Sequence, residues 1–413
     1  MIVIGAGAAG LAAAAALVDA GRSVLVLEAR ERIGGRCLTR RMPGLPVPVE
    51  LGAEFIHGRP EVTFALLRKA GIAAINSTRT QRFLNRGKLE PIDAFAEAQK
   101  ATRDSAALRK NDLSFMKFLE KQKQLPAVTR TFALMMVQGF DAADPKLVSA
   151  REIAGEWGGG TTMGSSQLRP FGGYGPLLES LAGSGARLQL QTSVREVRWK
   201  RGRVEIDGTF LGKPFAAEAS RAIVTLPLGV MQAGSVRFTP ALREKRAALK
   251  KLASGPVIRV ALVFRTAFWT ENFRDVAFFH SPQAAFPTFW TPLPMRAPLL
   301  TAWAGGPKAA RLTGRPAQEL VRLALATVKG VFGTSKTAEL VAAYVQDWQD
   351  DPCARGGYSY VTVGGQGARE LLAAPMQDTL YFAGEATDTE GEAGTVAGAL
   401  ASGYRAAREI AAS

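Results

Sequence analysis

The sequence predicts an α/β protein in which a dinucleotide-binding domain is interleaved with a second domain. An apolar run at 2–4 leads into a glycine-rich turn and an alanine-rich segment, and a second apolar run at 24–27 ends on Glu28. A chain of 413 residues favours two domains over one, because single cores usually stop growing below about 300 residues. With 47% hydrophobic and 21% charged residues, the composition is that of an ordinary globular protein, so a large core can form.

The opening segment has the order strand, tight glycine turn, helix, strand and acid. Gly5 permits the turn, Gly7 lets a pyrophosphate approach the backbone, and Gly10 lets helix and strand pack closely. The N–H groups at the helix start, at Ala8 and Ala9, favour the negative charge of a phosphate. This pattern predicts dinucleotide binding, and the alternative is an ordinary βαβ turn.

The residues after the second strand extend this prediction. Glu28 stands where it would accept hydrogen bonds from an adenosine ribose. Gly34 and Gly35, followed by Arg36, indicate a backbone bend beside phosphates, with a guanidinium able to fork onto them. The alternative for these three residues is a turn with a surface arginine.

These motifs resemble the N-terminus of the flavin-containing amine oxidase family. That family includes monoamine and polyamine oxidases, L-amino-acid oxidases and the lysine-specific histone demethylases. The resemblance rests on residues 5–10, 28–30, 34–36 and 49–58. It implies a Rossmann-type FAD-binding domain interleaved with an α+β substrate domain, an architecture like that of p-hydroxybenzoate hydroxylase.

The resemblance assigns further residues to the cofactor. Ala29 and Arg30 belong to the motif that follows the second strand, and the backbone of Gly52, Ala53 and Glu54 is expected to pass the flavin. In the same motif, His57 faces the flavin ring or the substrate, and the alternative is a structural histidine.

Residues 60–165 are expected to be mostly helical and to shape the mouth of a substrate pocket. Apolar residues at helical spacing predict helices at 61–69, 92–109 and 113–123, and the glycines of 157–164 predict a loop.

The alternating residues of 188–197 and 203–206 predict a hairpin, and 221–227 predicts a buried strand ended by proline. By resemblance, Val194 stands where the family clasps adenine with main-chain groups. The resemblance also divides the chain into interleaved domains: an FAD-binding domain at 1–58, 173–232 and 374–413, and a substrate domain at 59–172 and 233–373 with a helical insertion at about 60–165.

Arg259 is a departure from the family. In many members a lysine at this position holds a water at flavin N5, the atom that accepts the hydride. A guanidinium stays charged and presents a fixed fork of donors. Arg259 therefore holds a water, binds a substrate carboxylate or turns away. Four nearby aromatic residues form either a pocket wall or plain core: Phe286, Phe289, Trp290 and Trp303.

The C-terminal quarter carries a second set of family motifs. Trp348 and Tyr358 belong to a segment that lies against the flavin, and Tyr358 is expected to form a pocket wall, with a buried core tyrosine as the alternative. Covalent members of the family carry a flavin-linked cysteine immediately before this tyrosine. Gly357 stands there and Cys353 is too early, so the resemblance implies non-covalent FAD.

The last motif runs from a strand into the final helix. By resemblance, Gly384 and Glu385 end the strand, and Glu385 binds ribityl hydroxyls. Gly394 precedes a helix whose first amides, at Thr395 and Val396, point at the N1–C2=O edge of the flavin. That edge becomes anionic on reduction, so a helix N-terminus stabilises the reduced ring. Thr395 also replaces the second aromatic residue that monoamine oxidases place before the flavin.

Bulk composition excludes several other classes. Two histidines and two cysteines argue against a metal site or a disulfide framework. The net charge of +16 is scattered, without a basic tract or a nucleic-acid-binding module, so a nucleic-acid partner is not expected. No apolar run reaches the roughly 20 residues of a membrane span, and no signal peptide is expected, so a cytoplasmic location is predicted. Whether Met1 is the natural start is left open.

The sequence as a whole predicts an FAD-dependent amine oxidase acting on a small-molecule amine and O2. Arg259, Tyr358, Thr395 and His57 are its candidate catalytic residues. One alternative is a flavin dehydrogenase or desaturase of a non-amine substrate that passes electrons to a quinone or a protein. Another is a non-catalytic flavoprotein in an assembly. The particular amine, the electron acceptor and the oligomeric state are left open, with a homodimer as one alternative.

Overall fold

The computed structural model describes residues 1–103, 105–158, 166–333 and 339–412. The glycine-rich loop predicted at 157–164 lies outside these residues from position 159 onward.

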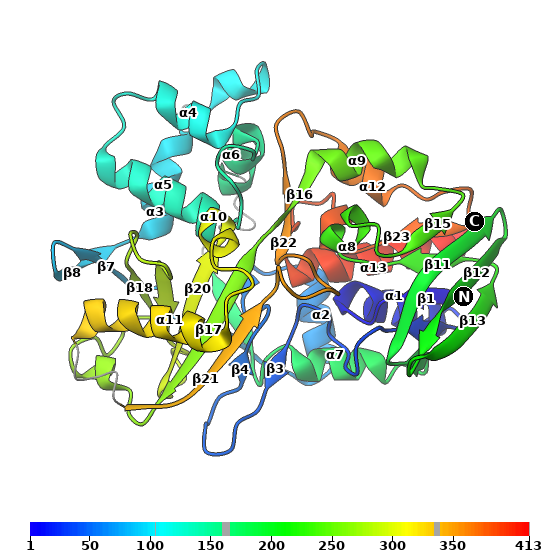
Figure 1. Cartoon of the computed structure of the whole chain (residues 1–413), viewed down its shortest axis with the longest axis horizontal. Coiled ribbons are helices and arrows are strands. Elements are labelled where there is room, and N and C mark those ends of the chain that lie inside the picture. The colour runs from blue at the N-terminus through cyan, green and yellow to red at the C-terminus, as the bar shows by residue number, and fades with distance from the viewer. Residues whose placement is uncertain (104, 159–165, 334–338, 413) are drawn as a thin grey trace.

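One half of the molecule is built on a five-stranded sheet with the order β10-β2-β1-β14-β23 (Figure 1). All its neighbouring strands are parallel. The inner strands are buried apolar runs because both faces of the sheet are covered. The strands are β1 (Ile2–Ile4), β2 (Leu25–Leu27), β10 (Arg187–Gln189), β14 (Ala222–Val224) and β23 (Leu380–Phe382).

Helices cover one face of this sheet and a second sheet covers the other. The helical face consists of α1 (Ala8–Asp19), α7 (Gly175–Ala182), α13 (Val396–Ala412) and α2 (Glu61–Lys69), whose side chains share one core with Val3. On the opposite face, Trp199 packs in the core that contains Ile2 and Ile4. The covering sheet consists of the antiparallel strands β11 (Thr192–Lys200), β12 (Arg203–Phe210) and β13 (Lys213–Ala219), with β15 (Arg237–Thr239) parallel to β11.

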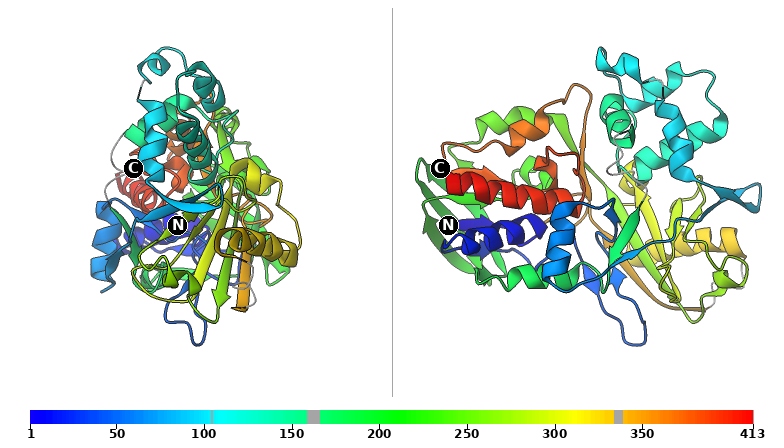
Figure 2. Two further views of the ribbon diagram at one scale, coloured as in Figure 1. Left: turned by 90° about the vertical axis from the view of Figure 1, so that its left-hand side faces the viewer. Right: turned by 180° about the vertical axis from the view of Figure 1, so that it is seen from behind.

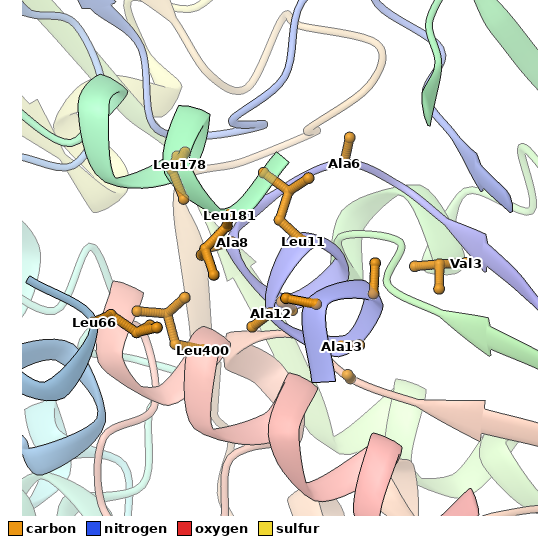
Figure 3. Close-up of a cluster of buried hydrophobic side chains, with 14 of the residues drawn as sticks. Val3, Ala6, Ala8, Leu11, Ala12, Ala13, Leu66, Leu178, Leu181 and Leu400 are labelled. Atoms are coloured by element: carbon orange, nitrogen blue, oxygen red, sulfur yellow. The ribbon is translucent and has the colours of Figure 1, made fainter. Parts of the chain in front are cut away.

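The alanine-rich helix α1 lies between α7 and α13 (Figure 3). Seen from behind, α1 and α13 run side by side (Figure 2). A Cβ atom at Gly403 of α13 would stand 2.3 Å from the carbonyl oxygen of Ala9. At the start of α1, a Cβ atom at Gly10 would stand 1.9 Å from the carbonyl oxygen of Gly5. Because Gly403 and Gly10 have no side chain, α13 and the glycine turn can approach α1 this closely.

The other half is built on a seven-stranded sheet with the order β21-β17-β20-β19-β18-β7-β8. The amphipathic helix α11 (Ala317–Phe332) packs on it over a core of apolar side chains that includes Ile258, Phe279 and Leu300. The strands are β7 (Gln81–Asn85), β8 (Lys88–Ile92), β17 (Val257–Phe264), β18 (Phe278–His280), β19 (Thr288–Trp290), β20 (Leu299–Gly305) and β21 (Leu340–Asp347).

Four helices gather beyond one end of this sheet around a core of their own, which includes Phe115, Phe132 and Trp157 (Figure 1). They are α3 (Ala94–Gln99), α4 (Phe115–Lys121), α5 (Ala127–Gly139) and α6 (Ala150–Gly158). The remaining helices and strands are β3 (Thr39–Arg40), β4 (Val49–Glu50), β5 (Ile56–His57), β6 (Ala74–Asn76), β9 (Gln167–Pro170), β16 (Leu252–Gly255), β22 (Tyr358–Val361), α8 (Leu228–Gln232), α9 (Arg246–Lys251), α10 (Gly306–Ala310) and α12 (Ala368–Ala373).

Two expected elements differ from the structure. The single helix expected at 92–109 is wrong: the Asp93 carboxylate caps the start of α3, and the Thr102 hydroxyl donates to the carbonyl of Gln99, so that only short 3-10 turns follow. The hairpin expected from 188 starts at Thr192, because Gln191 has a φ of +52° and interrupts the extended chain. The preceding residues form β10 in the parallel sheet instead.

The architecture confirms the predicted α/β class. The parallel sheet takes its strands from the beginning, the middle and the end of the chain, as interleaved domains require. The residue boundaries of the two domains stay a prediction.

Substituting Gly403 with alanine tests the contact between α1 and α13. The added Cβ would press on the Ala9 carbonyl, so we expect Gly403→Ala to lower the free energy of unfolding by about 1–3 kcal/mol. Gly330→Ala is the matched control, because Gly330 lies in α11 with no atom near its Cβ position, and alanine there should add about 0.5–1 kcal/mol. Urea denaturation of both variants gives their free energies of unfolding. Equal changes in the two variants would contradict a tight contact between α1 and α13 at Gly403.

Candidate active site

A cavity of about 1260 Å³ extends between the two halves of the molecule. Its lining combines the glycine turn at 5–9, the strand ends at 28–30 and 384–385, the start of α13, and residues of α5, α6 and β17. Every site residue predicted from the sequence lines the cavity except Gly10, which lies beneath it. Segments far apart in the chain thus meet at one cavity.

The glycine turn forms one end of the cavity. No side chain caps the N-terminus of α1, whose first residues Ala8 and Ala9 line the cavity, so the amides there are available to an anion. Gly7 forms a bridge with Gly34, and a Cβ at Gly35 would stand 3.3 Å from the Cα of Gly7. Gly34 and Gly35 have φ values of +97° and +56°, which glycine adopts without strain, so bare backbone of the kind that suits a pyrophosphate lines this end of the cavity.

Glu28 is held at the carboxyl end of β2. Its two oxygens accept from the amides of Ala6 at 2.8 Å and Arg30 at 2.9 Å, and each oxygen retains acceptor capacity for a ligand hydroxyl. The Arg30 guanidinium is drawn to Asp351 at 2.7 Å. Nearby, the register of β11 against β12 shifts between Val194 and Glu196, and Val194 lines the cavity.

Glu385 joins both ends of the chain. Its Oε1 accepts from Arg36 Nη1 at 2.9 Å, and its Oε2 accepts from Ser359 Oγ at 2.7 Å and from the Gly394 amide at 3.2 Å. Burial raises its pKa, but the charges of Arg36 and Arg369 and the hydrogen bond from Ser359 lower it by a larger amount, so the pKa of Glu385 is below its usual range. Glu385 is therefore an anion that positions Arg36, with Oε1 still able to accept from a cofactor hydroxyl.

Thr395 is the N-cap of α13. Its hydroxyl oxygen accepts from the Gly398 amide at 3.0 Å, and its own amide donates to the Glu392 carbonyl at 3.3 Å. Val396 begins the helix and lines the cavity, so its amide is the better placed of the two for an anionic ring edge.

Glu54 is the centre of a buried ion network. Its carboxylate accepts from Arg169 at 2.7 Å, from Trp290 Nε1 at 2.9 Å and from Arg259, whose other terminal nitrogen donates to the Gly52 carbonyl at 2.6 Å. Burial raises the pKa of Glu54, but the two guanidinium charges lower it more, and the net pKa is reduced. Arg259 is 2% exposed, and its Nε has no hydrogen-bond partner among the described residues.

The aromatic residues separate into wall and core. Tyr358 lines the cavity, and its hydroxyl donates to the Phe140 carbonyl; burial raises its pKa well above the usual value, so it is a neutral phenol. Trp290 and Trp303 also line the cavity, whereas Phe286 and Phe289 are core residues of the seven-stranded sheet. Both alternatives predicted for this aromatic group thus occur.

His57 lies among rings on the cavity wall. Its imidazole contacts Phe140 edge-on with the centroids 5.3 Å apart, and Phe55 lies 6.2 Å away. Burial, and next the positive charge of Arg79, lower the pKa of His57 to about 4. The imidazole is therefore neutral at physiological pH.

Several lining or supporting residues were not found from the sequence. Arg169 of β9 is 5% exposed and, besides Glu54, donates to Ser77 and to the carbonyls of Leu293 and Thr291. β9 reads Gln-Leu-Arg-Pro, which gives no local signal for a buried arginine. Other missed lining residues include Gln81, Phe140, Asp141, Glu152, Glu156, His280 and Arg369. They come from motif-poor segments.

The cysteines and carboxylates give no sign of a metal centre. Burial raises the pKa of Cys37 to about 12, so this thiol is inert. Within residues 1–103, 105–158, 166–333 and 339–412, no group of three histidine, cysteine or acidic side chains is arranged to hold a metal ion. No helix in the described parts of the chain is long and apolar enough to cross a membrane.

One end of the cavity fits a dinucleotide, because it combines bare backbone, the uncapped start of α1 and the acid at the end of β2. With the aromatic-lined extension of the cavity, these features define a dinucleotide-dependent oxidoreductase. Residues 8–411 match the family model described as flavin containing amine oxidoreductase, and the chain belongs to this family. Members depend on FAD, which is therefore the cofactor of this protein.

Relatives in sequence and structure agree with this assignment. Human lysine-specific histone demethylase 2 is 28% identical over 100% of this chain and 53% of its own length. Polyamine oxidase 3 of Oryza sativa subsp. japonica is 28% identical, over 99% of this chain and 88% of its own. A structure of putrescine oxidase bound to putrescine superposes with a TM-score of 0.85 at 24% identity, over 100% of this chain and 98% of that one. The chain spans about half the length of the histone demethylases, and the structural likeness shows the fold alone.

Replacing Glu54 tests the ion network. Glu54→Gln would leave two buried guanidinium groups without a counter-charge, so we expect it to lower the free energy of unfolding by about 3–5 kcal/mol. Glu319→Gln is the control, because Glu319 pairs with the exposed Arg315 and should change stability by less than about 1 kcal/mol. Urea denaturation of the two variants gives the comparison. Similar losses would mean that the network does not support the cavity wall.

Proposed function

We propose that this protein is an amine oxidase that converts a C–N bond of its substrate to an imine with FAD as the hydride acceptor. The observation that carries the proposal is that one cavity joins the dinucleotide cradle to a compartment walled by Tyr358, Trp290 and Trp303. A ligand bound along the cradle would present its far end to that compartment. Aromatic walls suit the apolar part of an amine.

The described residues supply a contact for each part of the cofactor. The amides of Ala8 and Ala9 would hold the pyrophosphate, the Glu28 carboxylate the ribose and main-chain groups at Val194 the adenine. Farther along the cavity, the Val396 amide would meet the N1–C2=O edge of the flavin, and Arg36, oriented by Glu385, lies between the two ends. When bound, FAD would supply the hydride acceptor and an outlet for the electrons to O2, with hydrogen peroxide as the product.

The side chains around the reacting carbon act by excluding water and by setting the charge of the amine. The amine must be neutral to react, and a buried, mostly apolar compartment disfavours its charged form. Among the described residues of the aromatic compartment, His57 has a pKa of about 4 and Tyr358 is a neutral phenol, so neither acts as a strong base. The proton of the amine therefore leaves to solvent before oxidation. Hydrolysis of the imine then yields an aldehyde or keto product and ammonia or an amine.

The pairing of Arg259 bears on the substrate class. Its two terminal nitrogens already donate to the Gly52 carbonyl and to Glu54, so its fork of donors is occupied and is not offered to a substrate carboxylate. This favours amines without a carboxylate over acidic substrates. The unpartnered Nε of Arg259 is the group best placed to hold a water. The cytoplasmic location stays a prediction, and the oligomeric state stays open.

Anaerobic mixing with amines tests the proposed reaction. We expect the flavin absorbance to bleach with at least one member of a panel of mono-, di- and polyamines, and hydrogen peroxide to form in equal amount to the product when air is admitted. Amino acids should bleach it more slowly, because Arg259 is already paired. A flavin that no amine reduces would rule out the assignment, and dye reduction without peroxide would favour a dehydrogenase.

Acid precipitation tests how the cofactor is held. Gly357 precedes Tyr358, so no thiol stands at the position where covalent members of the family attach the flavin, and we expect all the yellow colour in the supernatant. A Cys353→Ser variant serves as the control and should behave identically. Colour that stays on the pellet of the parent protein would contradict non-covalent binding.

A further inference from the structure

Three carboxyl groups stand on one side of the cavity. Asp141 follows the end of α5, while Glu152 and Glu156 lie four residues apart on α6 and therefore share one face of that helix. All three residues line the cavity. We call these three side chains the acidic wall.

The acidic wall contrasts with the chain as a whole, which carries 52 Lys and Arg against 36 Asp and Glu. Two arginines lie near it but serve other groups. Arg151 donates to the Leu108 carbonyl and to Gln366, and Arg369 donates to Ser359 and to the Ala386 carbonyl. Neither arginine forms an ion pair with the acidic wall in the described part of the chain, although the charge of Arg369 lowers the pKa of Glu156 from a distance. The wall therefore lacks a direct counter-ion.

Asp141 is the member of the acidic wall that most clearly lacks a partner among the described residues. It is 6% exposed, and neither carboxyl oxygen has a hydrogen-bond partner among the described residues. The indole N–H of Trp157 lies close enough to lower the pKa of Asp141, but it makes no hydrogen bond of good geometry to either carboxyl oxygen. A buried carboxylate without partners costs several kcal/mol, so such a group either keeps a proton or meets a cation.

The surroundings raise the pKa values of the acidic wall. Burial comes first for each group, and the neighbouring carboxylates add to it: Glu156 acts on Asp141, and Glu152 acts on Glu156, whose pKa is about 7. From β22, Tyr358 faces Asp141 and Glu156. Glu392, in the loop before α13, also has a pKa near 7, to which Glu156 contributes. A bound cation would relieve this repulsion and displace a proton.

The acidic wall is connected to the aromatic compartment. Phe140 precedes Asp141, contacts His57 edge-on, and accepts a hydrogen bond from the Tyr358 hydroxyl through its carbonyl. A flexible chain lying along these rings can therefore reach from the compartment to the wall. An aliphatic chain with a cationic group at each end matches an aromatic compartment that leads to an acidic wall.

We propose that the acidic wall binds a second ammonium group of the substrate, so that the substrate is an aliphatic diamine or polyamine that reacts at one end and is held at the other. This inference rests on the proposed amine oxidation and assigns Asp141, Glu152 and Glu156 as specificity-determining residues. Oxidation of one end leaves the other ammonium unchanged, so the wall acts on binding and orientation and takes no part in the bond changes.

The test compares amines of equal length in the holoenzyme. Diaminobutane and diaminooctane are each paired with butylamine and octylamine, and flavin reduction is followed anaerobically to give a maximal rate and an apparent Kd. We expect the diamines to exceed their monoamine partners by about tenfold or more in the ratio of rate to Kd, as a charge-assisted contact supplies. Equal ratios for diamines and monoamines would overturn the inference while leaving amine oxidation in place. Failure of all four amines, and of the wider panel, to reduce the flavin would count against amine oxidation itself.

A substitution at Glu156 localises the effect. Glu156→Gln should weaken diamine binding by about 10- to 100-fold and change the monoamine constants by less than about twofold. Glu120→Gln, an exposed position on α4, removes the same charge and should leave both amines unaffected. A parallel loss for both amines in Glu156→Gln would overturn the specificity role. If that variant does not fold, Glu152→Gln supplies the same comparison. A lysine-rich basic peptide that reduces the flavin better than either diamine would overturn the assignment of a small amine as substrate.

Discussion

The close packing of α1 against α13 determines the position of the site. Gly403 lies against the Ala9 carbonyl, and the alanine-rich surface of α1 leaves no bulk to separate the two helices. Both helices begin at the cavity, although one starts at residue 8 and the other at residue 396. Two positive helix ends are thereby directed at one long cavity, as binding an extended anionic cofactor requires.

Charged side chains then tie the remaining segments to this pair of helices. Arg36 from the N-terminal region and Gly394 from the C-terminal region both donate to Glu385, so the two ends of the chain share one buried anion. In the other half, Glu54 receives Arg169 and Arg259. Because removing one partner of a buried ion pair is costly, these contacts hold the cavity walls in place even though they add little net stability.

The charges in the cavity differ in how fully they are balanced. The carboxylate of Glu54 is satisfied by two arginines and an indole, whereas Asp141 has no hydrogen-bond partner among the described residues. A carboxylate whose hydrogen bonds are all made holds its partners in place, whereas a carboxyl group without hydrogen bonds can still accept them from a ligand. This difference separates the structural part of the cavity from the part to which we assign selectivity. In sequence, Glu54 could be identified by its family motif, whereas Asp141 belongs to no motif.

The sequence by itself predicted the fold class and a phosphate cradle, because these depend on local spacing between glycines, apolar runs and an acid, and it indicated FAD through its resemblance to a known family. Tertiary structure alone decided the partners of the charged residues. Arg259 could be identified as a departure from the family, but its pairing with Glu54 joins β17 to a segment about 200 residues earlier. Asp141 and Glu156 come together for the same reason: their meeting depends on how α5 and α6 pack, and no local pattern encodes that contact.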